Sequence, residues 1–244
     1  NIIHGNFGNS VFLRMPVTQA IIMHLGPTLY LTLLALSMSV VLGIISGVIA
    51  SSHHNSIIDQ LIMVVTSLGV AIPNFWLALM LVLVVALPVN FFPVAGYEPI
   101  TDAGLLGTLR YLILPAVALG FGQAASIARM TRANMLEVLQ NDYIRTARAK
   151  GVPPNKVIFK HALKNAVIPT VTVIGLSFAN LMGGAVVTEQ IFNIPGIGRL
   201  LVTAVLRRDY ELISGIVLYI SAAYVMINLL IDIIYAYLDP RIKL

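Results

Sequence analysis

The chain has 244 residues, of which 58% are hydrophobic and only 10% are charged. Soluble domains carry about 25% charged residues, so this composition excludes a water-soluble globule. The mean hydropathy of +0.91 indicates a protein that lies mostly in lipid, and the net charge of +5 reflects cations placed between membrane spans. The absence of cysteine excludes disulfides, thiolate metal sites and a cysteine nucleophile.

Five segments lack charged residues and are long enough to be membrane-spanning helices, which need about 20 residues. They cover residues 25–50, 61–89, 111–128, 166–188 and 212–231. The third is short, and we expect Arg129 and Arg132 to lengthen it by snorkelling to the interface. Pro73 predicts a kink in the second. The sequence therefore predicts an all-α, polytopic membrane protein with one domain over residues 1–244.

The distribution of Lys and Arg between the spans predicts the orientation. Residues 51–60, 129–165 and the C-terminal tail together carry about twice as many of the 15 Lys and Arg as the other segments, so we expect them inside. Residues 1–24, 90–110 and 189–211 are then outside. Gly43 and Gly47 form a small-xxx-small pair, for which packing within the chain is favoured over a subunit interface.

The loop over residues 141–165 predicts two short helices with a sharp bend. Asn141 or Asp142 suits the start of the first helix, and Gly151 suits the left-handed position after its end. Pro153 or Pro154 can begin the second helix, which we expect to reach Lys164. From the residues alone, two interpretations are equally supported, namely a partner-binding surface with small residues and cations, or a basic helix on anionic headgroups.

Several motifs together resemble the permease subunits of binding-protein-dependent ABC importers, in the dipeptide, oligopeptide and nickel branch. RTARAKG at 145–151 is similar to that branch's form of the EAA-x3-G loop, in which Ala147 and Gly151 match and Arg145 and Thr146 depart. The other matching stretches are SLGVAIPNFW (67–76), FFPVAGY (91–97), ARMTRANMLEVL (128–139), TEQIFNIPGIGRLL (188–201), RRDY (207–210) and NLLIDIIYAYLDPR (228–241).

This resemblance implies a type I ABC importer permease fold, with one further helix before residue 1 and six in the full-length protein. It implies a multi-pass subunit of a prokaryotic cytoplasmic membrane that imports peptides by alternating access. The expected partners are a second, homologous permease subunit, two cytoplasmic ATPase subunits and an external substrate-binding protein. Nickel chelates or glutathione are the alternative substrates.

The resemblance also assigns the candidate site residues. The ATPase-coupling residues are Asp142, Tyr143, Arg145, Thr146, Ala147, Arg148, Ala149, Lys150 and Gly151. The residues expected to contact the binding protein or to seal an outer gate are Glu189, Asn193, Pro195, Gly196, Arg199 and Asp209, and both roles stay open for them.

The chain itself is expected to be neither an enzyme nor a cofactor protein. It has no G-x-x-x-x-G-K-[ST] phosphate loop, so ATP and Mg²⁺ would be bound by the partner ATPase subunits. An intramembrane enzyme is the rival from another class, but no H-E-x-x-H motif occurs and His24, His53, His54 and His161 lie at span edges or in loops. We therefore expect no catalytic residue, no metal site and no nucleic-acid partner.

Overall fold

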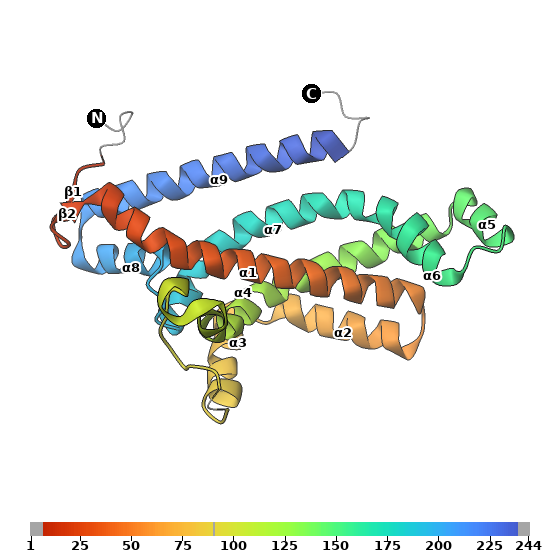
Figure 1. Cartoon of the computed structure of the whole chain (residues 1–244), viewed down its shortest axis with the longest axis horizontal. Helices are drawn as coiled ribbons and strands as arrows, with labels where there is room; N and C mark the ends of the chain where they lie inside the picture. The colour runs from red at the N-terminus through yellow and green to blue at the C-terminus, as the bar shows by residue number, and fades with distance from the viewer. Residues whose placement is uncertain (1–6, 90, 239–244) are drawn as a thin grey trace. The chain divides into compact units, whose positions relative to one another are not determined.

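The computed structural model describes residues 7–89 and 91–238, with side chains at 232 and 234–238 excepted. Four long helices have the length and composition of membrane spans. They are α1 (Val17–Ser52), α4 (Ile100–Leu139), α9 (Tyr210–Leu238) and the continuous helix Pro154–Ile191, which contains α6 (Pro154–Lys156), η3 (Val157–Ala162) and α7 (Leu163–Ile191) (Figure 1). The last residues of the predicted 228–241 motif lie outside the described residues.

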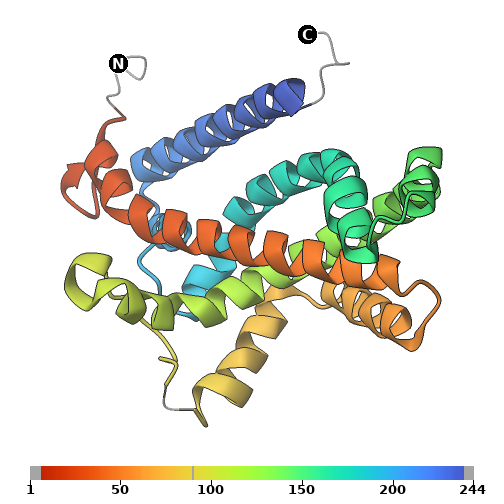
Figure 2. The same ribbon diagram turned by 45° about the vertical axis from the view of Figure 1, so that its right-hand side comes forward.

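The predicted second span is a broken helix. α2 (Ile57–Ala71) is followed by α3 (Asn74–Leu81) and η2 (Val82–Ala86), and the two parts are bent by 105° at Pro73 (Figure 2). The Ile72 N–H still donates to Leu68 O at 2.9 Å and the Leu77 N–H to Pro73 O at 3.1 Å, so the bend keeps its flanking backbone groups bonded. The predicted kink is confirmed.

The remaining elements are short. A hairpin of β1 (Asn9–Ser10) and β2 (Met15–Pro16) precedes α1, and it is an addition to the predicted all-α fold. α5 (Asp142–Ala149) lies between α4 and α6, and α8 (Ile197–Arg207) lies between α7 and α9. The second loop helix does not end at Lys164 as predicted, because it continues through the π-helical turn η3 into α7.

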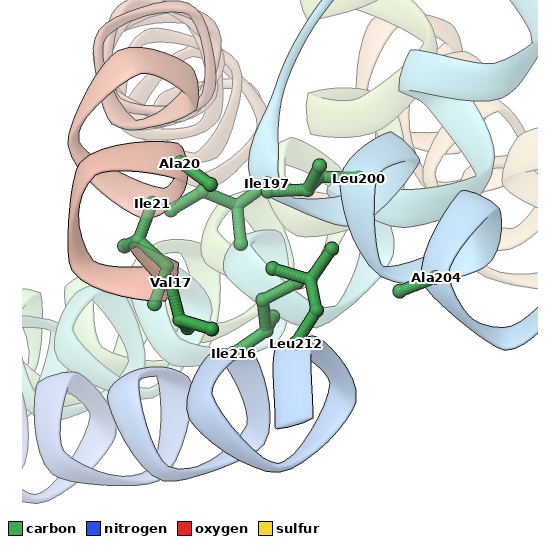
Figure 3. Packing of buried hydrophobic residues seen from close by; sticks show 8 residues of the cluster. All are labelled: Val17, Ala20, Ile21, Ile197, Leu200, Ala204, Leu212 and Ile216. Carbon is green, nitrogen blue, oxygen red and sulfur yellow. The ribbon is translucent and has the colours of Figure 1, made fainter. Parts of the chain in front are cut away.

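The chain forms two compact units, and the long helices contribute to both. Of the described residues, unit 1 holds 7–35, 73–89, 91–119 and 178–228. Its core joins α1, α8 and α9 through Val17, Ala20, Ile21, Ile197, Leu200, Ala204, Leu212 and Ile216 (Figure 3). Each of these side chains is at most 5% exposed, so α8 is fixed against the beginnings of two long helices.

Of the described residues, unit 2 holds 36–72, 120–177 and 229–238. In it α2 turns back along the second half of α1 (Figure 1). Gly43 and Gly47 of α1 lie against α4, since a Cβ at Gly47 would stand 2.6 Å from Ala128 O and a Cβ at Gly43 2.9 Å from Ala124 O. The prediction that this glycine pair packs within the chain is confirmed.

Candidate functional site

The two ends of α5 are defined by local backbone chemistry. Asn141 precedes the helix and its carbonyl accepts from the Arg145 N–H at 3.2 Å, but its side chain makes no capping bond. At the other end Gly151 has φ +76°, its N–H donates to Arg148 O, and the Val152 N–H donates to Ala147 O. These two bonds are those of a Schellman motif, which confirms the predicted role of Gly151 as the residue that ends the helix.

α5 is attached to unit 2 by one buried side chain. Ile144 is fully buried in a cluster that also contains Val48, Met135, Val157, Ala162 and Ala166. Beside it the Tyr143 hydroxyl accepts a 2.8 Å hydrogen bond from Asn165 Nδ2 at the start of α7. Neither Ile144 nor Asn165 was among the predicted site residues, although Ile144 is an isolated large aliphatic residue in a polar helix.

The predicted coupling residues form the solvent-exposed surface of α5 and of the two residues that follow it. All of them are exposed except Ala147, which is half-buried. The Arg145–Asp142 ion pair is 3.7 Å long between side chains that are 76% and 97% exposed, so it contributes little to stability. Arg145, Arg148 and Lys150 therefore present their charges to solvent or to a partner.

The helices on either side of α5 extend well past the predicted membrane spans. α4 continues from residue 128 to Leu139, which at about 1.5 Å a residue is roughly 16 Å. The helix after α5 begins at Pro154, so about 18 Å precede the predicted span at 166. A headgroup layer is only about 5–7 Å deep, and both helical extensions are longer than that.

A second feature of unit 2 is an ion pair between α2 and α4. Arg132 Nε and Nη2 donate to the two oxygens of Asp59 at 2.6 and 2.7 Å, and Asp59 is 2% exposed. Arg132 therefore does not snorkel as predicted, because a bidentate carboxylate satisfies its guanidinium inside the protein. Both residues come from segments predicted to be inside.

In unit 1 Glu189, near the end of α7, caps α8. Its fully buried carboxylate accepts from the Arg199 N–H at 2.9 Å and from the Thr28 hydroxyl at 2.6 Å. Thr28 Oγ1 in turn accepts from the Ile197 N–H at 2.8 Å. Glu189 and Thr28 thus satisfy two of the backbone N–H groups that the first turn of α8 leaves without helical partners. A Cβ at Gly196 would overlap the carboxylate, which explains why glycine precedes the helix.

Asp209 holds the N-terminal hairpin in the same way. It is 3% exposed and accepts from Ser10 Oγ at 2.6 Å, from the Phe12 N–H and from the Leu212 N–H, so it also caps α9. Burial raises the pKa of Asp209, but these hydrogen bonds lower it by more than burial raises it. The net pKa therefore lies below the ordinary carboxyl value. Glu211 adds a bond from the Asn9 N–H at 2.8 Å.

The six predicted outer residues therefore separate into two groups. Glu189, Gly196 and Asp209 are buried in the isolated chain. Asn193 is exposed, and Pro195 and Arg199 are half-buried. The carbonyl of Asn193 accepts from Arg199 Nη1 at 3.2 Å. Among the described residues, no three His, Asp or Glu side chains gather to hold a metal ion.

Comparison with known proteins gives a family that fits this arrangement. Residues 39–244 match the model of the binding-protein-dependent transport system inner membrane component. The chain belongs to this family. It is therefore a multi-pass inner membrane component of a transport system, without a catalytic role of its own, and the family implies ATPase and binding-protein partners.

Curated relatives match the whole chain. A putative peptide transport system permease protein of Brucella abortus (strain 2308) is 46% identical over 243 residues, which are 100% of this chain and 77% of that protein. A dipeptide transport system permease protein of Alkalihalophilus pseudofirmus is 41% identical, with 98% and 78% covered. An oligopeptide transport system permease protein of Bacillus subtilis (strain 168) is also 41% identical, with 100% and 78% covered.

A solved structure confirms the fold. A chain of the MetNI methionine ABC transporter in an inward-facing conformation superposes with a TM-score of 0.74, covering 91% of this chain and 97% of that one at 18% identity. A crystal structure of an amino acid ABC transporter with histidines gives a TM-score of 0.62 at the same identity, with 92% and 95% covered. The predicted importer permease fold is thus confirmed.

Proposed function

We propose that the chain is a permease subunit of an ATP-driven peptide importer. In this assignment it pairs with a second, homologous permease subunit, two ATPase subunits dock on the face of α5, and an external binding protein delivers the substrate. The peptide class is supported by relatives that are 41–46% identical over nearly the whole chain and are named for peptide, dipeptide or oligopeptide transport.

The position of α5 is the observation that carries the ATPase-docking part of the proposal. It follows a helical extension of roughly 16 Å past the end of a predicted span, which is longer than a headgroup layer is deep and brings α5 within reach of a soluble protein. Its exposed side carries three cations and small residues, so a groove with acidic groups can approach its backbone closely.

The attachment of α5 explains how force would reach the membrane helices. Ile144 is fixed in a core built from α1, α4, η3 and α7, and Tyr143 is bonded to Asn165. A movement of the docked helix therefore displaces the cytoplasmic part of α7 as well, because a close-packed core transmits displacement. Reversing a 1:99 equilibrium to 99:1 needs about 5.5 kcal/mol of differential binding, which two ATPase subunits closing on ATP can supply.

At the outer end, α8 is a short helix whose N-terminus is held by Glu189 and Thr28. We assign this buried group to the outer gate, where it keeps α8 in place against α1 and α9. The remaining outer residues, Asn193, Pro195 and Arg199, are those accessible to a binding protein.

The test is a double substitution in α5, Ala147→Arg with Gly151→Pro, in the complete transporter. Proline cannot adopt the φ of +76° at Gly151, and an arginine at Ala147 blocks close approach to the helix. We expect loss of the copurifying ATPase subunits and of ATP hydrolysis stimulated by the loaded binding protein. The matched control is Asn155→Arg, which adds a cation to the same loop outside α5.

Retention of both assembly and stimulated hydrolysis by the double variant would refute the docking assignment. The peptide class is tested separately by uptake of labelled di- and oligopeptides into proteoliposomes with the cognate binding protein. Uptake of only metal chelates or glutathione would replace peptides as the substrate.

A further inference from the structure

A cavity of about 270 Å³ opens in unit 1 beside α8. Its lining comes from the N-terminal hairpin, the beginning of α1, the loop before α8 and α8 itself. The lining residues are Leu13, His24, Pro195, Arg199, Leu200 and Thr203. All of these belong to segments that the Lys and Arg distribution places outside.

Arg199 gives this cavity its charge. Its backbone N–H is held by Glu189, and its Nη1 donates to the carbonyl of Asn193, so the side chain has a defined position. Within residues 7–89 and 91–238 it makes no ion pair, and no Asp or Glu lines the cavity. A guanidinium fixed at the wall of a small cavity is a receptor for a planar anion such as a carboxylate.

The surface around the cavity is also positive. The cations of the hairpin and of α8 are Arg14, Arg199, Arg207 and Arg208, and all except the half-buried Arg199 are exposed. Arg207 lies over the Phe12 ring at 4.8 Å, which fixes it above the hairpin. The nearby acids Glu189 and Asp209 are buried by their hydrogen bonds, so among the described residues Glu211 is the exposed acid that offsets these charges.

Exposed apolar side chains border the cations. Leu206 and Tyr210 are 77% and 73% exposed at the end of α8 and the start of α9. Tyr and Arg with apolar neighbours are the composition typical of a protein-binding surface. A cavity of about 270 Å³ is below the usual range of small-molecule sites, roughly 300–1,000 Å³, so it suits an inserted side chain better than a whole peptide.

We propose that this cavity receives a carboxylate side chain from an acidic face of the external binding protein, with Arg199 as its partner. The inference rests on the proposed function and adds the chemistry of the docking contact. Arg14, Arg207 and Arg208 steer the acidic face toward the site, and the pair with Arg199 fixes its register.

The experiment measures the affinity of the loaded binding protein for the assembled transporter in nanodiscs of zwitterionic lipid. Arg199→Gln removes the charge without touching the backbone N–H that Glu189 holds. We expect affinity to fall about tenfold or more, as for loss of one partner of a close charge pair, and Arg199→Lys to retain most of it. Arg110→Gln, which removes an exposed cation from another segment of the predicted outer face, is the matched control.

A second variant tests the cavity itself. Thr203→Phe fills the space from α8 while every cation stays in place, and it should lower the affinity as strongly as Arg199→Gln. Equal affinities for the wild type, Arg199→Gln and Thr203→Phe would overturn the proposal. So would a loss in Arg199→Gln no larger than in Arg110→Gln.

Three further results would each overturn the proposal in a distinguishable way. Binding of free peptide to the wild type without binding protein, lost in Arg199→Gln, would make the cavity a substrate site instead of a docking contact. Affinity that depends on Arg199 only when anionic lipid is present would assign the cations to headgroups. If the wild type binds no binding protein at all, the proposed function itself fails, whatever the variants do.

Discussion

Truncation of the Ile144 side chain tests the attachment of α5 to its core without changing the exposed surface of the helix. This side chain is fully buried among residues of α1, α4, η3 and α7, whereas the predicted coupling residues are exposed or, at Ala147, half-buried. Ile144→Ala therefore leaves the exposed face of α5 unchanged and weakens only its hold on unit 2. We expect ATPase subunits to remain bound while substrate transport is lost.

The size of the effect follows from the buried carbon atoms. Ile→Ala removes three carbons, each worth about 0.8 kcal/mol when buried, which gives about 2.4 kcal/mol from transfer alone. A cavity that does not collapse raises the cost within the range of about 2–5 kcal/mol known for such substitutions. Since about 1.4 kcal/mol is a factor of ten, the ratio of attached to detached α5 falls by roughly 50-fold or more.

Two measurements check this prediction. Hydrogen exchange of residues 142–152 should speed up by about the same factor, and the ratio of peptide transported to ATP hydrolysed should fall. Ile57→Ala is the control, because Ile57 is 75% exposed at the start of α2. Unchanged exchange and unchanged coupling in Ile144→Ala would show that α5 does not depend on this anchor.

Three further predictions concern other parts of the structure. Gly196→Ala should lower the free energy of unfolding by more than about 2 kcal/mol because the added methyl group overlaps the Glu189 carboxylate. Gly183→Ala, whose methyl group meets nothing within 4 Å, should not lower it in this way. Equal melting temperatures for the two variants would contradict this prediction. Asp59→Asn should lower the free energy of unfolding by about 3 kcal/mol because Arg132 loses its carboxylate partner. The double variant Asp59→Leu with Arg132→Met should regain much of that stability in thermal unfolding. A double variant as unstable as Asp59→Asn would contradict this prediction. Asp209 has a lowered pKa, so its bonds to the hairpin stabilise the fold fully above about pH 4 and are lost as the pH falls through that lowered pKa. Hydrogen exchange of residues 9–16, corrected for its intrinsic pH dependence, should show this loss in the wild type but not in Asp209→Asn. Identical pH profiles for the two proteins would contradict this prediction.

The fold followed from the sequence where a single physical rule decides the outcome. Charge-free segments indicated the spans, and Pro73 indicated the break in the second one. The lengths of the helices were not predictable in this way. α1 begins at Val17 and α4 reaches Leu139, because hydropathy indicates only the part of a helix that lies in lipid and not where the helix begins or ends. The second loop helix likewise continues past Lys164 into α7, although α7 contains Pro169.

At the candidate sites, local signals were reliable and long-range partners were not. Gly151 ends α5 as its sequence context requires. Arg132 was assigned to the interface because its carboxylate partner, Asp59, is 73 residues away and could not be paired with it by spacing. The partners of Glu189 could not be predicted for a similar reason, since Thr28 and the α8 backbone meet it only in the folded chain.

The hairpin contacts have a consequence for biogenesis. The Ser10 hydroxyl and the Asn9 N–H donate hydrogen bonds to Asp209 and Glu211, which follow them by 199 and 202 residues. At about 5–20 residues a second, the ribosome delivers those carboxylates roughly 10–40 s after the hairpin has been made. Until then the hairpin lacks these two acceptors, so its native contacts depend on the synthesis of α9.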